Sequence, residues 1–243
     1  MAQLGIIGSK GRMGSALVSA IEEAGHSLSG GADQGDDASA LAAQSDALID
    51  FSAPAALASN LAAARAASVP ILIGTTGLEA AHFASVEDAA AAIPVLQTGN
   101  TSLGVNLLSA LVEMAASRLG DDWDLEILEM HHRHKVDAPS GTAKLLGEAA
   151  AKGRGVNLAD VMDSGRHGHT GARKQGDIGF ATLRGGSVAG DHSVILAGEQ
   201  ERITLSHQAE DRMIFARGAV KAADWLIGKV AGRYTMGDVL GLR

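Results

Sequence analysis

Cysteine is absent from the 243-residue chain, so disulfide bonds, thiolate catalysis and cysteine-ligated zinc are all excluded. Aromatic residues make up only 3% of the sequence, which leaves few side chains on which nucleic-acid bases could stack. The formal net charge of −8 also argues against nucleic-acid binding, because such proteins need positive charge to meet phosphates. We therefore expect no nucleic-acid partner.

Long apolar runs are missing as well. The alanine-rich stretch at residues 53–67 is interrupted by Pro54, Asn60 and Arg65, and it falls short of the length that spans a membrane. The first residues enter an apolar segment at once, without the layout of a signal peptide. We expect no membrane association and a cytoplasmic location.

Short apolar segments alternate with helical patterns over the first hundred residues. This alternation is typical of an α/β protein with a doubly wound parallel sheet. We expect strands at Gln3–Gly8, Ser27–Ala32, Ala47–Phe51, Pro70–Gly74 and Pro94–Gln97, and helices at Gly14–Ala24, Pro54–Ala67 and Leu78–Ala92.

The pattern changes after Ser102 to that of an α+β domain on an open, mostly antiparallel sheet. A helical period returns at Met213–Lys229, which we expect to rejoin the first domain. The predicted domains are residues 1–102 with 213–243, and residues 103–212. In the second domain we expect helices at Val105–Leu119 and Thr142–Lys152, and strands at Trp123–Met130, Phe180–Arg184, Ser193–Leu196 and Arg202–His207.

Three glycines, Gly8, Gly11 and Gly14, follow the first predicted strand and lead into a helix. Without side chains, backbone N–H groups and the positive end of the helix can approach a pyrophosphate. The alternative is that these glycines serve only close packing. Their position at the first strand–helix turn favours a dinucleotide loop.

Asp33 lies at the end of the second predicted strand, about 20 residues after the glycines, where an acidic side chain binds ribose hydroxyls. Its carboxylate would repel a 2′-phosphate, and Gln34 follows it instead of a cation. We therefore predict that NADH is favoured over NADPH, with Arg12 as a cation that could reduce the difference. The alternative for Asp33 is a helix cap or a solvated loop residue.

Two further polar segments follow predicted strands and would lie at the same edge of the sheet. Residues 74–77 (Gly-Thr-Thr-Gly) could line the nicotinamide ribose site or form only a turn before a helix. Residues 98–102 (Thr-Gly-Asn-Thr-Ser) could contact the nicotinamide amide or act as a hinge.

A cluster of titratable residues, His131 to Lys135, ends the strand predicted in the second domain. A metal site is one interpretation, but Arg133 and Lys135 would repel a divalent cation, so we expect no metal. A solvated polar loop is a second interpretation. A proton-transfer site for an anionic substrate is the third, because a helix begins directly afterwards at residues 140–142 and its positive end attracts carboxylates.

The chain resembles the 4-hydroxy-tetrahydrodipicolinate reductase (dihydrodipicolinate reductase) family of bacterial lysine and diaminopimelate synthesis. The His-His-Arg-His-Lys-Val-Asp-Ala-Pro-Ser-Gly-Thr run is the most specific motif. The resemblance rests on Gly8–Gly14, Asp50–Ser52, Gly74–Gly77, Ser102–Asn106, Glu129–Thr142, Gly179–Thr182, Arg184–Gly186, Gly190–His192, Gly198–Glu199 and Ala216–Ala219.

The resemblance implies a Rossmann-like first domain, a second domain used in a homotetramer, and reduction of a small dicarboxylate by NADH or NADPH. It assigns proton transfer to His131 and Lys135, and substrate binding to His132, Gly141 and Thr142. It implies cofactor contacts at Gly8, Ser9, Lys10, Gly11, Arg12, Met13, Asp33, Gly74, Thr75, Thr76, Thr98, Gly99, Asn100 and Thr101.

Two departures from the family pattern concern the cofactor. Many relatives have Ala-Pro-Asn-Phe where this chain has Thr98–Thr101, and many have a cation where it has Gln34. Two alternatives of other kinds stay open: a different dehydrogenase of dicarboxylates, such as an aspartate dehydrogenase, and a dinucleotide sensor without turnover. The histidine–lysine loop favours the reductase over both.

Overall fold

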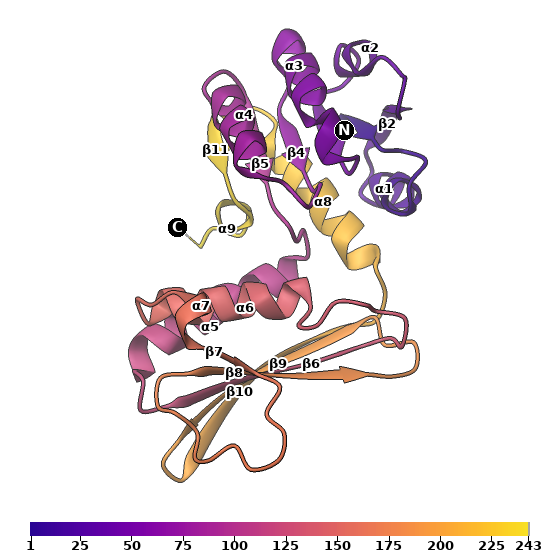
Figure 1. The fold of residues 1–243 in the computed structure, drawn as a ribbon. Helices are drawn as coiled ribbons and strands as arrows, with labels where there is room; N and C mark the ends of the chain where they lie inside the picture. Colours follow the sequence, from indigo (N-terminus) through magenta and orange to yellow (C-terminus); the bar gives the residue numbers. More distant parts are fainter. Residues whose placement is uncertain (243) are drawn as a thin grey trace. The chain divides into compact units, whose positions relative to one another are not determined.

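The computed structural model describes residues 1–242 and divides the chain into two compact units (Figure 1). The first unit comprises Met1–Leu103 and Arg212–Arg243, and the second comprises Gly104–Asp211. These limits differ by one residue at each junction from the expected domain boundaries. In the part of the chain that the structure describes, no helix combines the length and apolar character needed to cross a bilayer.

The first unit is built on a parallel sheet with the strand order β11-β5-β4-β3-β1-β2. Every pairing recorded among these strands is parallel. The strands are β1 (Gln3–Ile7), β2 (Ser27–Ala32), β3 (Ala47–Asp50), β4 (Ile71–Ile73), β5 (Pro94–Gln97) and β11 (Gly232–Tyr234).

Helices cover both faces of this sheet, and each face has its own core. The side chains of Leu72 and Ile73, neighbours on β4, belong to opposite cores because successive side chains of a strand point to opposite faces. The predicted doubly wound α/β fold is therefore confirmed. One face carries α1 (Arg12–Glu23), α8 (Met213–Leu226) and α9 (Met236–Val239), and the other carries α2 (Ala38–Ala42), α3 (Leu57–Ala67) and α4 (Ala80–Ala90).

Several element boundaries differ from those expected. The helix expected from Pro54 begins as a 3-10 turn over Pro54–Ala56, and α3 starts only at Leu57. The last long helix ends at Leu226 because Ile227 is extended, with ψ of 128°. The short strand β11 was not expected, since Gly232–Tyr234 has no apolar run, and it forms through pairing with β5.

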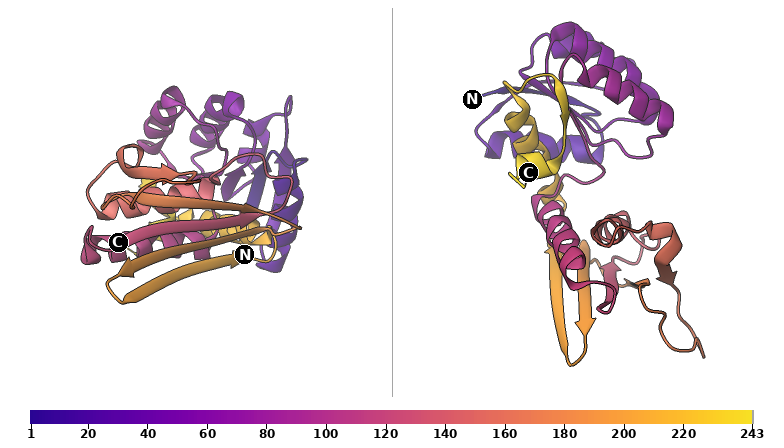
Figure 2. Two further views of the ribbon diagram at one scale, coloured as in Figure 1. Left: turned by 60° about the horizontal axis from the view of Figure 1, so that its bottom comes forward. Right: turned by 90° about the vertical axis from the view of Figure 1, so that its left-hand side faces the viewer.

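The second unit packs α5, α6 and α7 against an open sheet with the order β10-β9-β6-β8-β7 (Figures 1 and 2). β10 and β6 each pair antiparallel with β9, whereas β8 pairs parallel with both β6 and β7. The sheet is thus mixed, and not mostly antiparallel, because α6 and α7 return the chain before β7, and residues 165–177 return it again before β8. The elements are α5 (Leu103–Leu119), β6 (Asp124–His131), α6 (Gly141–Gly153), α7 (Leu158–Val161), β7 (Met162–Ser164), β8 (Ile178–Arg184), β9 (Gly190–Gly198) and β10 (Glu201–Ala209).

Strand β6 changes character along its length. Its alternate residues Leu125, Ile127, Glu129 and His131 are all buried on the face that packs against the helices. The first two belong to the apolar core, while the last two are titratable. The sheet therefore carries its polar site at the end of β6, next to the start of α6.

Candidate active site

The loop after β1 has room for no side chain at Gly8 or Gly14. A Cβ on Gly8, whose φ is +85°, would lie 2.6 Å from the Phe51 carbonyl oxygen, and one on Gly14 would lie 2.0 Å from the Ser9 carbonyl oxygen. Gly11 precedes α1 and supplies no side-chain cap, which leaves the positive helix end open to an anion. Close packing thus accounts for two glycines, and the uncapped helix start fits a pyrophosphate.

Asp33 lies directly after β2, and it lines a cavity of about 630 Å³ together with Gly8. Its carboxylate accepts hydrogen bonds from Ser9 Oγ (2.6 Å) and from the backbone N–H of Lys10 (3.1 Å). The bond from Ser9, with those from Lys10, holds the pKa of Asp33 below its ordinary value. Lys10 Nζ lies 4.0 Å from the carboxylate, so Lys10 is a cation beside Asp33, and the role suggested for Arg12 stays a prediction.

Two predicted cofactor residues are tied into the protein by their hydroxyl groups. Thr75 is 4% exposed and donates to Asp50, a fully buried carboxylate that also accepts from Asn60. Thr101 is 2% exposed and donates to the carbonyl oxygen of Phe215 (2.7 Å). Both hydroxyls hold chain segments together, a role that the sequence did not reveal.

The other predicted cofactor residues also follow strands of the parallel sheet. Gly74 follows β4, where a Cβ would lie 2.3 Å from the Phe51 ring, and Thr98 follows β5 and donates to the Asn100 carbonyl oxygen (2.9 Å). Apart from its two chain neighbours, no described residue comes within 4 Å of the place of a Cβ at Gly99. The carboxyl ends of β1, β2, β4 and β5 meet at one edge, which is where nucleotides bind in this class of fold.

Three further residues of this predicted set differ in exposure. Arg12 and Thr76 are exposed, and Met13 packs against the core beneath α1 and α8. Met13 therefore contributes packing, while Arg12 and Thr76 are accessible to a ligand.

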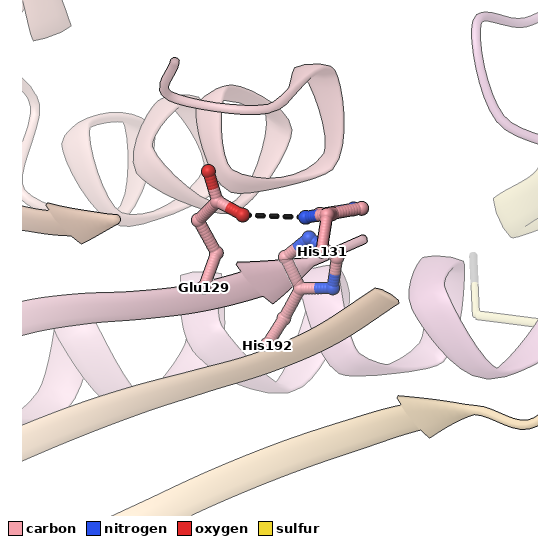
Figure 3. Close-up of side chains that lie close together, drawn as sticks. All are labelled: Glu129, His131 and His192. Atoms are coloured by element: carbon pink, nitrogen blue, oxygen red, sulfur yellow. Dashed lines mark hydrogen bonds and ion pairs between the residues drawn. The ribbon is translucent and has the colours of Figure 1, made fainter. Parts of the chain in front are cut away.

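Glu129 and His131 lie two residues apart on β6 and point to the same side as His192 of the neighbouring strand β9 (Figure 3). Glu129 is 1% exposed, and it accepts hydrogen bonds from His131 Nδ1 (2.5 Å) and from Arg184 Nη1 and Nη2 (2.9 and 3.0 Å). Burial would raise the pKa of Glu129, but the bonds from Arg184 and His131 outweigh it and lower the pKa below its ordinary value. Glu129 is thus an ionised carboxylate beneath His131.

Helix α6 begins beside this carboxylate. Ser140 caps it by accepting a hydrogen bond from the N–H of Ala143 (3.1 Å), while its own N–H donates to Glu129 Oε1 (3.1 Å). Gly141 is the first helical residue, is exposed and has no atom within 4 Å of the place of a Cβ. The helix therefore begins with an accessible, positive end at Gly141 that suits a carboxylate.

The segment between β6 and α6 is held in place by its backbone. The N–H of His132 donates to the carbonyl oxygen of Val188 (2.8 Å), and the N–H of Lys135 donates to that of His132 (3.1 Å). Lys135 Nζ lies 2.8 Å from Asp137 Oδ1, and this contact lowers the pKa of Asp137. The solvated-loop interpretation therefore fits exposed residues such as His134, and not Lys135.

The residues that the structure groups as possible metal ligands differ from the histidine cluster that the sequence suggested. Within the described chain, ligand atoms of Glu129, His131 and His192 lie within 4.8 Å of one another. Both oxygens of Glu129 already bind the guanidinium of Arg184, which a divalent cation would have to displace. The absence of a metal stays our prediction.

Arg184, Ser140 and His192 have site contacts that the sequence did not assign to them. The alternation along β6 could have placed Glu129 and His131 on one face. Arg184 and His192 come from β8 and β9, and only the strand register brings them beside β6, where Glu129 pairs with His192 and His131 pairs with Arg184.

We expect His192 to make the free energy of unfolding depend on pH. Burial, with a smaller effect from the charge of His131, lowers its pKa from 6.5 to about 4. Between these values the unfolded chain binds more protons, so this stability is complete above about pH 6.5 and is lost as the pH falls. At about pH 5 the loss should be roughly 2 kcal/mol. Urea unfolding at both pH values should show a smaller loss for His192→Asn, and an equal loss would contradict this assignment.

Two profiles of known families match this chain and together span nearly all of it. The family described as "Dihydrodipicolinate reductase, N-terminus" matches residues 2–101, and "Dihydrodipicolinate reductase, C-terminus" matches residues 104–240. A solved structure titled "Dipicolinate bound Dihydrodipicolinate reductase from Paenisporosarcina sp. TG-14" has the same fold, with a TM-score of 0.74, 20% identity and coverage of 97% of each chain.

Two curated relatives are similar over nearly their full length. The 4-hydroxy-tetrahydrodipicolinate reductase of Zymomonas mobilis subsp. mobilis is 57% identical, with 99% of this chain and 97% of the relative covered. That of Acidiphilium cryptum is 52% identical, with 99% and 98% covered. The resemblance inferred from the motifs is confirmed. The chain therefore belongs to the dihydrodipicolinate reductase family of nicotinamide-dependent oxidoreductases.

Proposed function

We propose that the second unit binds the substrate and transfers its protons through His131 and Lys135. The chain is an oxidoreductase of diaminopimelate and lysine synthesis that reduces 4-hydroxy-tetrahydrodipicolinate to tetrahydrodipicolinate with NADH or NADPH. The observation that carries the residue roles is the juxtaposition of a histidine held by a buried carboxylate with the open start of α6.

The substrate is a small dicarboxylate, and the second unit offers matching groups. One carboxylate would bind the N–H groups and hydroxyl at Gly141 and Thr142, where the helix end is positive. The other would bind the side of His132 and Lys135. Both contacts place the ring next to His131, whose Nδ1 is bound to Glu129.

The reaction consumes one hydride and one proton and releases water from ring carbon C4. The hydride for that carbon would come from NADH or NADPH when the cofactor is bound. His131 and Lys135 supply and remove the protons that the loss of the hydroxyl and the quenching of carbanion-like charge require. Asp137 holds the ammonium of Lys135 at 2.8 Å and keeps it positioned as a proton donor.

We propose that Gly8–Met13 and Asp33, with the ends of β4 and β5, hold the cofactor, and that NADH is favoured. Asp36 and Asp37 line the same cavity as Asp33, so a 2′-phosphate would meet carboxylates there. One like charge at about 4 Å near a protein surface costs on the order of 1–4 kcal/mol. Lys10 offsets part of this cost.

A coupled assay tests both the reaction and the cofactor preference. Pyruvate, aspartate semialdehyde and a dihydrodipicolinate synthase generate the substrate, and the loss of NADH or NADPH absorbance is followed. We expect oxidation that requires the synthase, with kcat/KM about 10-fold higher for NADH, in line with the partly offset repulsion. Tight NADH binding without oxidation would contradict the reaction, and equal kcat/KM values would contradict the role of Asp33.

We also propose that four chains assemble through the sheet face of the second unit that faces away from α5 and α6. Along the alternating strands this face presents Leu128, Met130, Leu183 and Ile195, which are partly or largely exposed. Leu183 is 48% exposed, and a group of exposed apolar side chains on one sheet face is typical of a protein–protein interface. Light scattering should give the mass of four chains, and a monomer would contradict the proposal.

We infer a cytoplasmic location for the enzyme, since its reaction draws on reduced nicotinamide cofactor. Detection of the protein in fractionated cells tests this inference, and its recovery outside the cytoplasmic fraction would contradict it.

A further inference from the structure

The ion pair of the buried Glu129 and the half-buried Arg184 is bonded to His131, to the loop that carries Lys135 and to the start of α6. We infer that this pair is a positioning device: it holds His131 with its proton on Nδ1, and it holds the Lys135 loop and the start of α6 in one arrangement. This inference rests on the proposed function. It adds Glu129 and Arg184, to which the proposed function assigns no contact with substrate or cofactor.

The contacts of Glu129 determine which nitrogen of His131 carries the proton. Oε2 accepts from His131 Nδ1 (2.5 Å) and from Arg184 Nη1 (2.9 Å). An ionised carboxylate can only accept hydrogen bonds, so Nδ1 must be the donor. In the neutral ring, Nε2 is then the acceptor and is the nitrogen available for proton exchange.

The position of Nε2 supports this assignment. A Cβ on Gly190 would lie 3.0 Å from His131 Nε2, so the absence of a side chain at residue 190 leaves space beside that nitrogen. His192 approaches the ring of His131 edge-on at 5.0 Å between centroids, and its own Nε2 pairs with Ser140 Oγ (3.0 Å). His192 thus restricts the orientation of the His131 ring without competing for the Nδ1 atom of His131.

Arg184 extends the pair to the lysine loop. Besides Glu129, its Nη2 donates to the carbonyl oxygen of Asp137 (2.6 Å). The carboxylate of the same Asp137 holds Lys135 Nζ at 2.8 Å. A chain of contacts therefore runs from Glu129 through Arg184 and Asp137 to the proposed proton donor.

Glu129 also fixes the start of α6. Its Oε1 accepts from Arg184 Nη2 (3.0 Å), from the Ser140 N–H (3.1 Å) and from Thr182 Oγ1 (3.2 Å). Ser140 caps α6 immediately before Gly141. The carboxylate that orients His131 is therefore bonded to the residue that sets the proposed carboxylate-binding end of the helix.

The titratable groups around His131 come from four directions: Glu129 on its own strand, Arg184 on β8, His192 on β9 and Lys135 in the following loop. Among the described residues, Glu129 is the acidic side chain that contacts the ring. Removal of its charge should therefore change the pH dependence of catalysis in a way that loss of packing alone would not.

The test is Glu129→Gln, which keeps the shape and removes the charge. Arg184 would draw the amide oxygen toward itself and turn the NH₂ group toward His131, which favours the wrong ring tautomer. We expect kcat to fall on the order of 10²–10⁴-fold, as for loss of an acid–base group, with a smaller change in KM for the substrate. The limb of the pH profile that arises from His131 should move to lower pH.

Glu126→Gln is the matched control. Glu126 lies on the same strand and pairs with Arg166 and Arg173, but it lies on the opposite face from Glu129. The control should keep the wild-type kcat and pH profile. An unchanged kcat and pH profile in Glu129→Gln would overturn the inference, while the synthase-dependent activity of the wild type would leave the proposed function standing.

A second measurement needs no variant. Nitrogen NMR of the wild type with labelled histidines, above neutral pH, should show His131 protonated on Nδ1. Protonation on Nε2 would overturn the inference even if Glu129→Gln does not fold. Arg184→Lys provides a further arm: it keeps the charge but loses the two-pronged contact, so kcat should fall less than in Glu129→Gln, and a larger fall would contradict the order of roles.

Discussion

Replacement of Lys135 by alanine is expected to lower kcat by roughly 10²–10⁴-fold, the range for loss of an acid catalyst. Lys135 Nζ is held by Asp137 at 2.8 Å, and the side chain is only 21% exposed. No other described lysine lies between β6 and α6. Steady-state rates in the coupled assay, at saturating NADH and substrate, measure this effect.

Lys152→Ala is the control for the lost charge. Lys152 belongs to the same unit and pairs with Glu113, but its side chain is 70% exposed at the far end of α6. We expect this variant to turn over like the wild type. Near-normal kcat in Lys135→Ala would remove Lys135 from proton transfer, and a raised KM alone would reduce its role to substrate binding.

Four strands of the first unit, β1, β3, β4 and β5, could be predicted well from the sequence because they are largely buried on both faces. Segments such as Ile71–Ile73 are wholly apolar, and each is followed by a helical pattern at a regular distance. The edge strand Gly232–Tyr234 could not be predicted, since it owes its conformation to pairing with β5 and not to its own residues. Local sequence propensity identifies strands with continuous apolar runs, and it misses a strand such as β11 whose conformation depends on pairing with a neighbour.

The second unit was harder to predict, and the reason is strand order. Each long strand was expected near its observed place, but the parallel pairing of β6 with β8 depends on two returns of the chain, first through α6 and α7 and then through residues 165–177. The same pairing brings Arg184 to Glu129 across 55 residues of sequence. The motif around His131 therefore indicated proton transfer. The position of Arg184 beside it could be known only from the strand register.

The candidate site shows the same division between local and long-range information. Gly141 at a helix start and Lys135 in a loop follow from spacing, since both lie within one continuous motif. The hydroxyl of Thr75 could not be assigned from its motif, because its partner Asp50 lies 25 residues earlier. Lys10 is a related case: it is 23 residues from Asp33 in sequence and 4.0 Å away in space.

Replacement of Gly14 by alanine is expected to disable the nucleotide loop. The new Cβ would lie 2.0 Å from the carbonyl oxygen of Ser9 and 2.7 Å from that of Gly8, both of them backbone atoms that cannot rotate away. The loop must therefore move, and a shift of about 1 Å in a positioned group can cost about 10²-fold in kcat/KM. Overpacking should also lower the free energy of unfolding by about 1–3 kcal/mol.

Titration of NADH fluorescence and urea unfolding measure the two effects separately, and Gly237→Ala is the control for adding a methyl group in the same unit. A Cβ on Gly237 would meet only Thr235 Oγ1, at 3.4 Å, an ordinary contact. This variant should bind NADH normally and lose little stability. If Gly14→Ala binds NADH as tightly as the wild type, the loop after β1 does not hold the pyrophosphate, and the glycines there serve packing alone.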